Sequence, residues 1–172
     1  MVHALAMEIY THALKQLDSS VLGLQQEQQR YLQCKRGCSS CCTDAFRIRY
    51  IEAKILLAQL TPETRQNLQK TSEQREGQCV FLVDQACSVY DYRPILCRAY
   101  GLILKASDSI GTCPLNYTEL ESTKGINILD MQPFYELLDE LSSRLWQADF
   151  PDKDPEPPLL PIAEYLKLLL DP

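Results

Sequence analysis

Apolar residues recur at helical spacing through the first part of this chain. Between Val2 and Gln33 they fall every three or four positions, which predicts amino-terminal helix. Asp18-Ser19-Ser20 and Gly23 interrupt the pattern, so a division into two helices stays open. The members of the stripe are Ala6, Tyr10, Ala13, Leu17, Val21, Leu24 and Tyr31.

Four later stretches also predict helices. Residues 51–60 form a short one with Ile51, Ile55 and Leu56 facing inward. The sequence from Thr61-Pro62 to about Arg75 resembles a cap followed by a polar, exposed helix. Two more apolar stripes follow, one after the expected cap Asp130 and one near the end of the chain: Met131, Phe134, Leu138, Leu141 and Leu145, then Ile162, Tyr165, Leu166 and Leu169.

The remaining segments have little periodicity. Val80 to Val83 reads as a short strand or buried loop, and Arg93-Pro94 predicts the start of a helical turn with proline first. The proline-rich, acidic stretch from Phe150 to Pro161 is typical of an extended linker. We therefore expect a mostly α fold, a small helical domain around an irregular cysteine-rich metal-binding centre. The predicted organisation is a helical segment over 1–33, a cysteine domain over 34–115 and a helical extension with its linker over 116–172.

Composition narrows the setting of this domain. A length of 172 residues suits one domain or one domain with an appendage, and the net charge of −6 disfavours a nucleic-acid partner. The first thirty residues lack the apolar run of a secretory signal, and no stretch approaches the 18 apolar residues of a membrane span. We expect a cytoplasmic protein without a membrane partner, and its protein partners stay unknown.

The eight cysteines are the main candidates for chemistry. In a reducing compartment such a set indicates metal binding rather than disulfides. Only two histidines, His3 and His12, accompany them, and both lie in the amino-terminal helical stripe. Thiolates select zinc, copper(I) or iron–sulfur clusters, so zinc or an iron–sulfur cluster is the expected cofactor. The predicted ligands are Cys34, Cys38, Cys41, Cys42, Cys79, Cys87, Cys97 and Cys113.

Two readings of the adjacent pair Cys41-Cys42 stay open. Neighbouring side chains tend to diverge, so both are difficult to place on one ion. Either the eight cysteines form two centres of four that divide the pair, or one member is a packed, inert thiol. We expect residues 34–42 and 79–113 to meet at a shared centre, because neither block alone has the spacing of a self-sufficient finger. The alternative is a four-ligand site within Cys79 to Cys113, with the first cysteine cluster free.

Cations close to the cysteines are candidates for offsetting thiolate charge. Arg93 and Arg98 flank Cys97, and we expect them to donate hydrogen bonds near the sulfurs. For Lys35 and Arg36 an exposed surface position is an equal alternative. The Cys34-x3-Cys38-x2-Cys41 spacing also occurs in radical S-adenosylmethionine enzymes, but the chain lacks the alternating strands and helices those enzymes require.

Taken together, these residues resemble the YkgJ-like cysteine-cluster family, named for its CxxCxxCC motif and described as zinc- or iron-chelating. Cys34, Cys38, Cys41 and Cys42 match the motif, except that three residues follow Cys34 where the motif has two. The most distinctive match is Cys87-Ser-Val-Tyr-Asp-Tyr-Arg-Pro-Ile-Leu-Cys97-Arg, and Cys113-Pro matches the last cysteine. The resemblance covers about residues 34 to 115.

What the resemblance implies is metal chelation without a defined metal. The flagellin lysine methylase group carries a similar cysteine domain, so an iron–sulfur-dependent, methyltransferase-like enzyme is one alternative function. A thiol redox protein is another, although the strand and helix context of thioredoxin-like motifs is missing. The sequence leaves open whether the chain is an enzyme.

Overall fold

The computed structural model describes residues 2–35, 37–65 and 77–170 of the chain. Most of the regular structure is helical and the strands are two or three residues long, which confirms the expected mostly α fold. The elements are α1 Val2–Glu27, η1 Gln29–Tyr31, β1 Arg47–Ile48, α2 Tyr50–Gln59, β2 Leu82–Val83, β3 Ala86–Cys87, η3 Tyr90–Tyr92, α4 Ile95–Ala99, β4 Leu104–Ala106, β5 Ser109–Gly111, β6 Leu129–Asp130, α5 Gln132–Asp149, β7 Leu160–Pro161 and α6 Ile162–Leu170.

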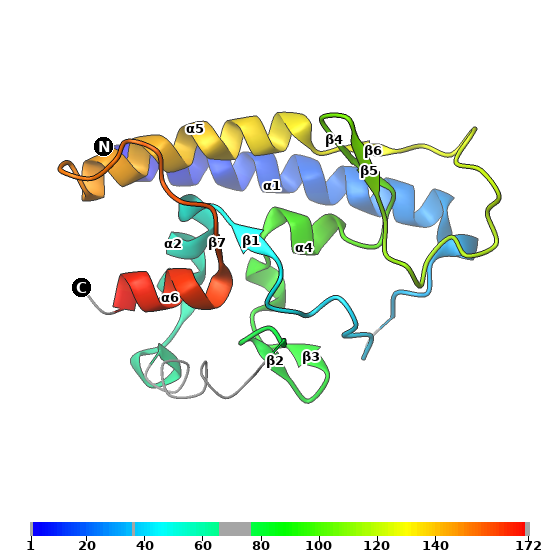
Figure 1. Ribbon diagram of the computed structural model, residues 1–172, viewed down its shortest axis with the longest axis horizontal. Coiled ribbons are helices and arrows are strands. Elements are labelled where there is room, and N and C mark those ends of the chain that lie inside the picture. Colours follow the sequence, from blue (N-terminus) through cyan, green and yellow to red (C-terminus); the bar gives the residue numbers. More distant parts are fainter. Residues whose placement is uncertain (1, 36, 66–76, 171–172) are drawn as a thin grey trace.

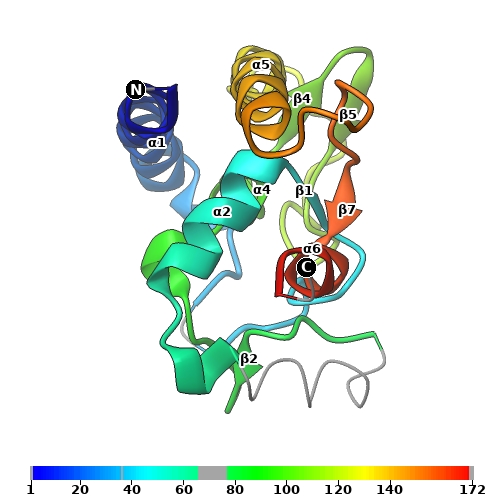
Figure 2. The same ribbon diagram turned by 90° about the vertical axis from the view of Figure 1, so that its left-hand side faces the viewer.

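The two long helices, α1 and α5, lie side by side and run in opposite directions, with α2 packed beneath them (Figures 1 and 2). α1 is one continuous helix, so the chain does not break at Ser19 or Gly23. Burial explains the continuity, because Leu17 and Val21 lie on either side of the Ser19-Ser20 step and are both buried. The hydroxyl of Ser20 donates to the Gln16 carbonyl at 3.1 Å, which satisfies it inside the helix.

The predicted apolar stripes of the later helices face the core. Leu138, Leu141 and Leu145 of α5 are buried, and so are Ile162, Tyr165 and Leu166 of α6. The helix after Thr61 begins as expected, since the Thr61 hydroxyl accepts a hydrogen bond from the Thr64 backbone N–H at 3.1 Å. Residues 62–65 are helical, and the rest of that predicted helix lies outside the described residues.

Pro94 corrects one detail of the prediction. It is the cap residue before α4 rather than its first helical residue, because its ψ of 156° is extended. The first N–H of the helix therefore belongs to Ile95, and a buried side chain from α2 accepts it, as described below.

The strands form three small sheets that join distant parts of the chain. β2 pairs with β3, and β4 pairs with β5 on one side and with β6 on the other. β1 and β7 pair antiparallel, with Ile48 opposite Leu160. The proline-rich segment before β7 also packs against the body of the protein, because the Trp146 indole donates to the Asp154 carbonyl at 2.8 Å.

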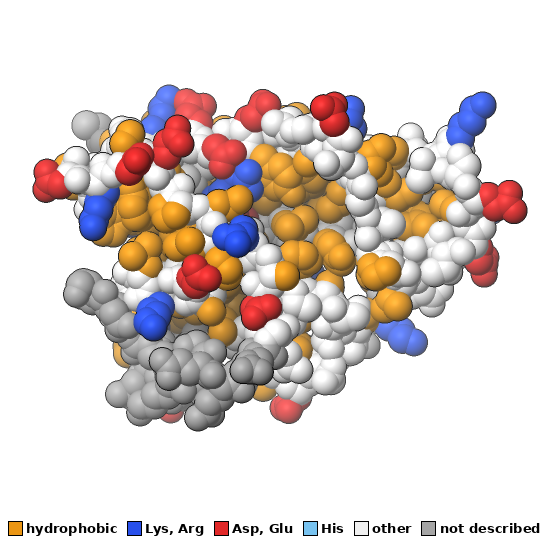
Figure 3. All heavy atoms as spheres, viewed as in Figure 1, with side chains coloured by type: hydrophobic (Ala, Val, Ile, Leu, Met, Phe, Trp, Pro, Cys, Tyr) orange, Lys and Arg blue, Asp and Glu red, His pale blue; other side chains and the backbone are white. Residues whose placement is uncertain are grey.

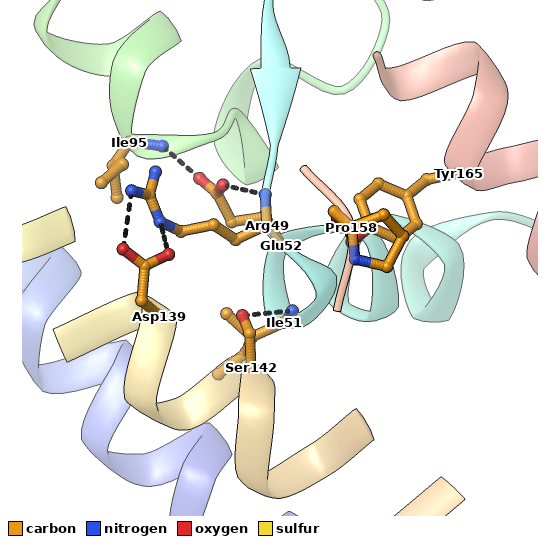
Figure 4. Close-up of polar contacts among 8 residues, drawn as sticks. All are labelled: Arg49, Ile51, Glu52, Ile95, Asp139, Ser142, Pro158 and Tyr165. Carbon is orange, nitrogen blue, oxygen red and sulfur yellow. Dashed lines mark hydrogen bonds and ion pairs between the residues drawn. The ribbon is translucent and has the colours of Figure 1, made fainter. Parts of the chain in front are cut away.

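Glu52 lies at the centre of the core and holds two helices at once (Figure 4). It is 3% exposed, and its carboxylate accepts the Arg49 backbone N–H at 2.9 Å and the Ile95 backbone N–H at 2.8 Å. The Arg49 side chain in turn pairs with Asp139 of α5 at 2.6 and 3.1 Å.

None of the helices formed by the described residues has both the length and the apolar character that a membrane crossing demands.

Candidate metal centre

The first cysteine block is a series of tight turns. Cys38 N–H donates to the Lys35 carbonyl, and Cys42 N–H donates to the Ser39 carbonyl, both at 2.9 Å. Gly37, at φ +88°, takes a backbone conformation that side-chain-bearing residues rarely adopt. These turns present several sulfurs from only nine residues of chain.

The second block begins with a hairpin whose turn is Asp84-Gln85. Both residues have positive φ, 48° and 60°, as a two-residue hairpin turn requires. The hairpin places Cys87 on β3, opposite Leu82 of β2. Farther along the chain, Cys97 lies on α4, and Cys113 is 3% exposed in the loop after β5.

The two blocks contact each other directly. The backbone N–H of Cys79 donates to the Cys42 carbonyl at 3.0 Å. The Ser39 hydroxyl donates to the side-chain carbonyl of Gln85 at the hairpin turn. Segments separated by about forty residues are thus in contact through their backbone and polar side chains. That their sulfurs share a centre stays a prediction.

The thiols are close enough to affect one another's ionisation. Burial raises the pKa of Cys42, and the thiols of Cys79 and Cys87 raise it further. Burial also raises the pKa of Cys41, to about 11, with contributions from Cys42 and Cys113. The pKa of Cys42 therefore responds to Cys79 and Cys87 and that of Cys41 to Cys113, while Cys38 raises both.

Cys97 is the most perturbed of these thiols. Burial raises its pKa well above the ordinary range, followed by the charges of Glu52, Cys79 and Cys87. None of the eight cysteines, all of them described, forms a disulfide bond. Among the described residues, no three histidine, cysteine, aspartate or glutamate side chains are gathered into a group that holds a metal ion as it stands.

Cys34 lies against residues that the sequence did not single out. The Nδ2 of Asn116 donates to Cys34 Sγ at 3.3 Å and to the Gly101 carbonyl at 2.7 Å. Gly101 has a φ of +115°, and a Cβ atom there would lie 2.8 Å from Cys34 Sγ. No periodicity marks either residue. Their only sequence signal is that Asn116 and Gly101 lie close to Cys113 and Cys97.

The cations near the cysteines have mixed roles. Burial raises the pKa of Cys87, and a backbone hydrogen bond from Val89 and the charge of Arg93 oppose that rise. The Arg93 guanidinium also lies 3.5 Å from the Tyr90 ring centroid. Arg98 pairs instead with Asp18 of α1 at 2.8 Å and donates to the Arg93 carbonyl at 2.8 Å. These contacts join α4 to α1 and do not involve a sulfur. Lys35 is exposed, and Arg36 lies outside the described residues.

Tyr100 links the cysteines to an open hollow on the surface. Burial raises its pKa first, and then the thiols of Cys113 and Cys41. The tyrosine also lines a hollow of about 270 Å³ on the face where Figure 3 shows apolar side chains over α4 and the start of α5. The other residues lining it are Leu96, Leu104, Ala106, Ser109, Gly111, Thr112, Met131 and Tyr135.

Comparison with known families concerns this same region. A family model described as "CxxCxxCC: Putative zinc- or iron-chelating domain" matches residues 33–119, about half of the 172-residue chain. All eight cysteines fall within the matched residues. No curated protein and no solved structure matches the chain.

Proposed function

Because this chain belongs to the CxxCxxCC family of zinc- or iron-chelating domains, we propose that it binds zinc or iron through its cysteine thiolates. Family membership confirms the resemblance derived from the sequence. The proposed ligands are the eight cysteines of residues 34–113, in a domain over 34–115 flanked by helical segments 1–33 and 116–172. A reducing compartment, the cytoplasm, suits a centre that works as thiolates.

The observation that supports this proposal most strongly is the meeting of the two cysteine blocks. The Cys79 N–H to Cys42 carbonyl hydrogen bond fixes the backbones of the two blocks together at 3.0 Å. Around that contact, thiols of both blocks act on each other electrostatically. Thiols that raise one another's pKa would be stabilised as thiolates by a bound cation, and thiolates suit zinc or an iron–sulfur cluster.

The contacts favour dividing the sulfurs into two groups. Cys42 interacts with Cys79 and Cys87, which we assign to one group, and Cys41 interacts with Cys113 in the other. Cys97 interacts with Cys79 and Cys87 and also with Cys41, and we assign it to the first group; Cys38 and Cys34 complete the second. This arrangement separates the adjacent pair, as two four-sulfur centres require. In the described structure the sulfurs do not form a group that could hold a metal ion. Binding a metal at each proposed centre therefore requires side-chain rotation and shifts of the loops. Turns and loops carry most of the cysteines, and such segments permit these movements.

The proposal is tested on protein purified without oxygen or chelators. Native and denaturing mass spectrometry are expected to differ by the mass of bound metal, and elemental analysis identifies it. A brown protein with visible absorption and bound iron favours an iron–sulfur cluster, and a colourless protein with bound zinc favours a zinc centre. Eight reactive thiols with no bound metal would refute the proposal.

Single variants test the grouping of the ligands. C97S and C113S are each expected to lose about half of the bound metal, and the double variant to lose nearly all of it. H12A, which removes a histidine of α1, is the control and keeps the full amount. Complete loss in either single variant would show one centre instead of two.

A further inference from the structure

We propose that Asn116 is a positioning residue for Cys34 and holds its sulfur in place as a metal ligand. This inference rests on the proposed thiolate centre and assigns a role to a side chain that is not itself a ligand. Asn116 is 4% exposed, and each polar atom of its amide has a partner.

The orientation of the Asn116 amide follows from its surroundings. Its Oδ1 accepts the Gln33 backbone N–H at 2.8 Å, a group that can only donate. Its Nδ2 must then face Cys34 Sγ at 3.3 Å and the Gly101 carbonyl at 2.7 Å, both of which accept. The Asn116 side chain thus contacts both the sulfur of Cys34 and the backbone N–H of Gln33, the residue before it.

Further hydrogen bonds hold Asn116 and its neighbours in place. The Asn116 N–H donates to the Cys113 carbonyl at 3.0 Å, which anchors the amide to a cysteine of the second block. The next residue, Tyr117, donates its N–H to the Tyr31 carbonyl at 2.9 Å and its hydroxyl to buried Gln28 at 2.6 Å. The segment that leads into Cys34 is therefore fastened to the segment that follows Cys113.

Gly101 sets the third side of the Cys34 position. Its missing side chain leaves the space that the sulfur occupies, because a Cβ there would lie only 2.8 Å away. The Cys34 side chain is exposed, and its sulfur is contacted on two sides, by the Gly101 backbone and by the Asn116 amide donor. An N–H···S bond also stabilises thiolate charge, and groups that orient metal ligands in this way typically contribute 10–100-fold in metal affinity.

A double-mutant cycle between Asn116 and Cys34 tests the role. N116D keeps the size and the oxygen that Gln33 needs, but it places a carboxylate oxygen where the donor faces sulfur. We expect N116D to weaken Zn²⁺ binding by roughly 10–100-fold in a chelator competition, and to lower the thiolate charge-transfer absorption of the Co²⁺-loaded protein. In a C34A background the same change is expected to have little further effect on Zn²⁺ affinity.

The matched control is N127D, which makes the same chemical change at an exposed asparagine whose amide donates to Glu27 at 2.8 Å. It is expected to bind Zn²⁺ as the wild type does. If circular dichroism shows that N116D does not fold, N116A replaces it in the same cycle. Equal losses from the Asn116 change with and without Cys34, or affinity unchanged by it, would overturn this inference. A wild-type protein that binds neither Zn²⁺ nor Co²⁺ would instead refute the thiolate centre itself.

Discussion

At the scale of single residues, Glu52 joins the helical core to the cysteine region. Its carboxylate accepts N–H groups at the beginnings of α2 and α4, and α4 carries Cys97. Burial raises the pKa of this carboxyl, and the two backbone hydrogen bonds oppose that rise. Glu52 therefore holds the start of the helix that carries Cys97.

Replacing Glu52 by glutamine tests this role. E52Q keeps the size of the side chain but turns an NH₂ group toward one of the two backbone N–H groups. Leaving a buried donor unpaired costs about 1–3 kcal/mol, and we expect a loss of that size in the free energy of unfolding measured with urea. E140Q, at the exposed α5 residue that pairs with Arg144, is expected to stay within about 0.5 kcal/mol of wild type. An E52Q protein as stable as E140Q would contradict this account.

Residue types in the sequence indicated the proposed cysteine ligands but not the residues that contact them. Cysteine is recognisable as a metal ligand from its residue type and spacing, so eight candidates followed from the sequence alone. Asn116 is an ordinary turn residue by sequence, and Gly101 is one glycine among six. Their roles depend on contacts with Cys34 across more than sixty residues, which local pattern does not encode.

At the scale of elements, Asp149 at the end of α5 connects three helices away from the cysteines. Its carboxylate lies 2.9 Å from His3 Nε2 of α1, 2.6 Å from the Tyr50 hydroxyl and 2.5 Å from Lys54 Nζ of α2. Burial alone would raise the pKa of Asp149, but the hydrogen bonds from Lys54, Tyr50 and His3 outweigh burial and lower it. The ionised form is therefore favoured by folding.

The stability provided by Asp149 is expected to depend on pH. A carboxyl with a lowered pKa in the folded state stabilises fully above its unfolded pKa of about 3.9, and this contribution disappears as pH falls through the folded value. We expect D149N to lose about 1–3 kcal/mol at pH 7. The gap between D149N and wild type is expected to narrow below about pH 4, as measured by urea unfolding at each pH.

Because Asp149 is not among the proposed ligands, D149N also separates stability from metal binding. Its metal content after anaerobic purification is expected to equal that of wild type. A difference in unfolding free energy between the two proteins that stays constant down to pH 3 would show that folding does not lower the pKa of Asp149.

The helices were predictable because their evidence is local. The stripe of α1 and the inward residues of α2, α5 and α6 all repeat every three or four positions. Of the strands, only β2 fell within a stretch offered as a strand or a buried loop, because two or three residues carry no period. The pairing of Ile48 with Leu160 joins segments more than a hundred residues apart, so neither β1 nor β7 has a signal of its own.

At the scale of the whole molecule, one hydrophobic core includes residues from both ends and from the cysteine region. Leu17 of α1, Phe81 beside the hairpin, Ile95 of α4 and Leu166 of α6 all belong to it. α6 contacts α2 and is held by the β1–β7 pair. Damage to the last helix is therefore expected to affect the whole fold.

Two leucines of α6 give a matched test. Leu166 is 4% exposed and Leu168 is 40% exposed. L166A is expected to lower the free energy of unfolding by about 2–5 kcal/mol, because it leaves a cavity in the core. L168A makes the same chemical change on the surface and is expected to cost well under 1 kcal/mol. Equal effects in chemical denaturation would mean that α6 does not share the core.

Metal removal is expected to weaken the fold as well. The metal-binding energy becomes folding energy wherever the unfolded chain has no formed site. Excess EDTA under argon is therefore expected to lower the melting temperature followed by circular dichroism, and added Zn²⁺ to restore it in a zinc-binding protein. A melting curve that chelator and metal leave unchanged would show that the centre carries no part of the stability.

The hydrogen bond between Gln33 and Asn116 has a consequence for how this domain can be moved between proteins. These residues lie near the two limits of the family match, 33 and 119, and they are in contact at 2.8 Å. The chain thus enters and leaves the cysteine region at one place, as insertable domains do. A segment with adjoining ends can be spliced into a surface loop of a host protein without stretching that loop. The ends of the cysteine region meet this requirement, and a host would also have to cover the faces of α2 and α4 that now pack against α1, α5 and α6.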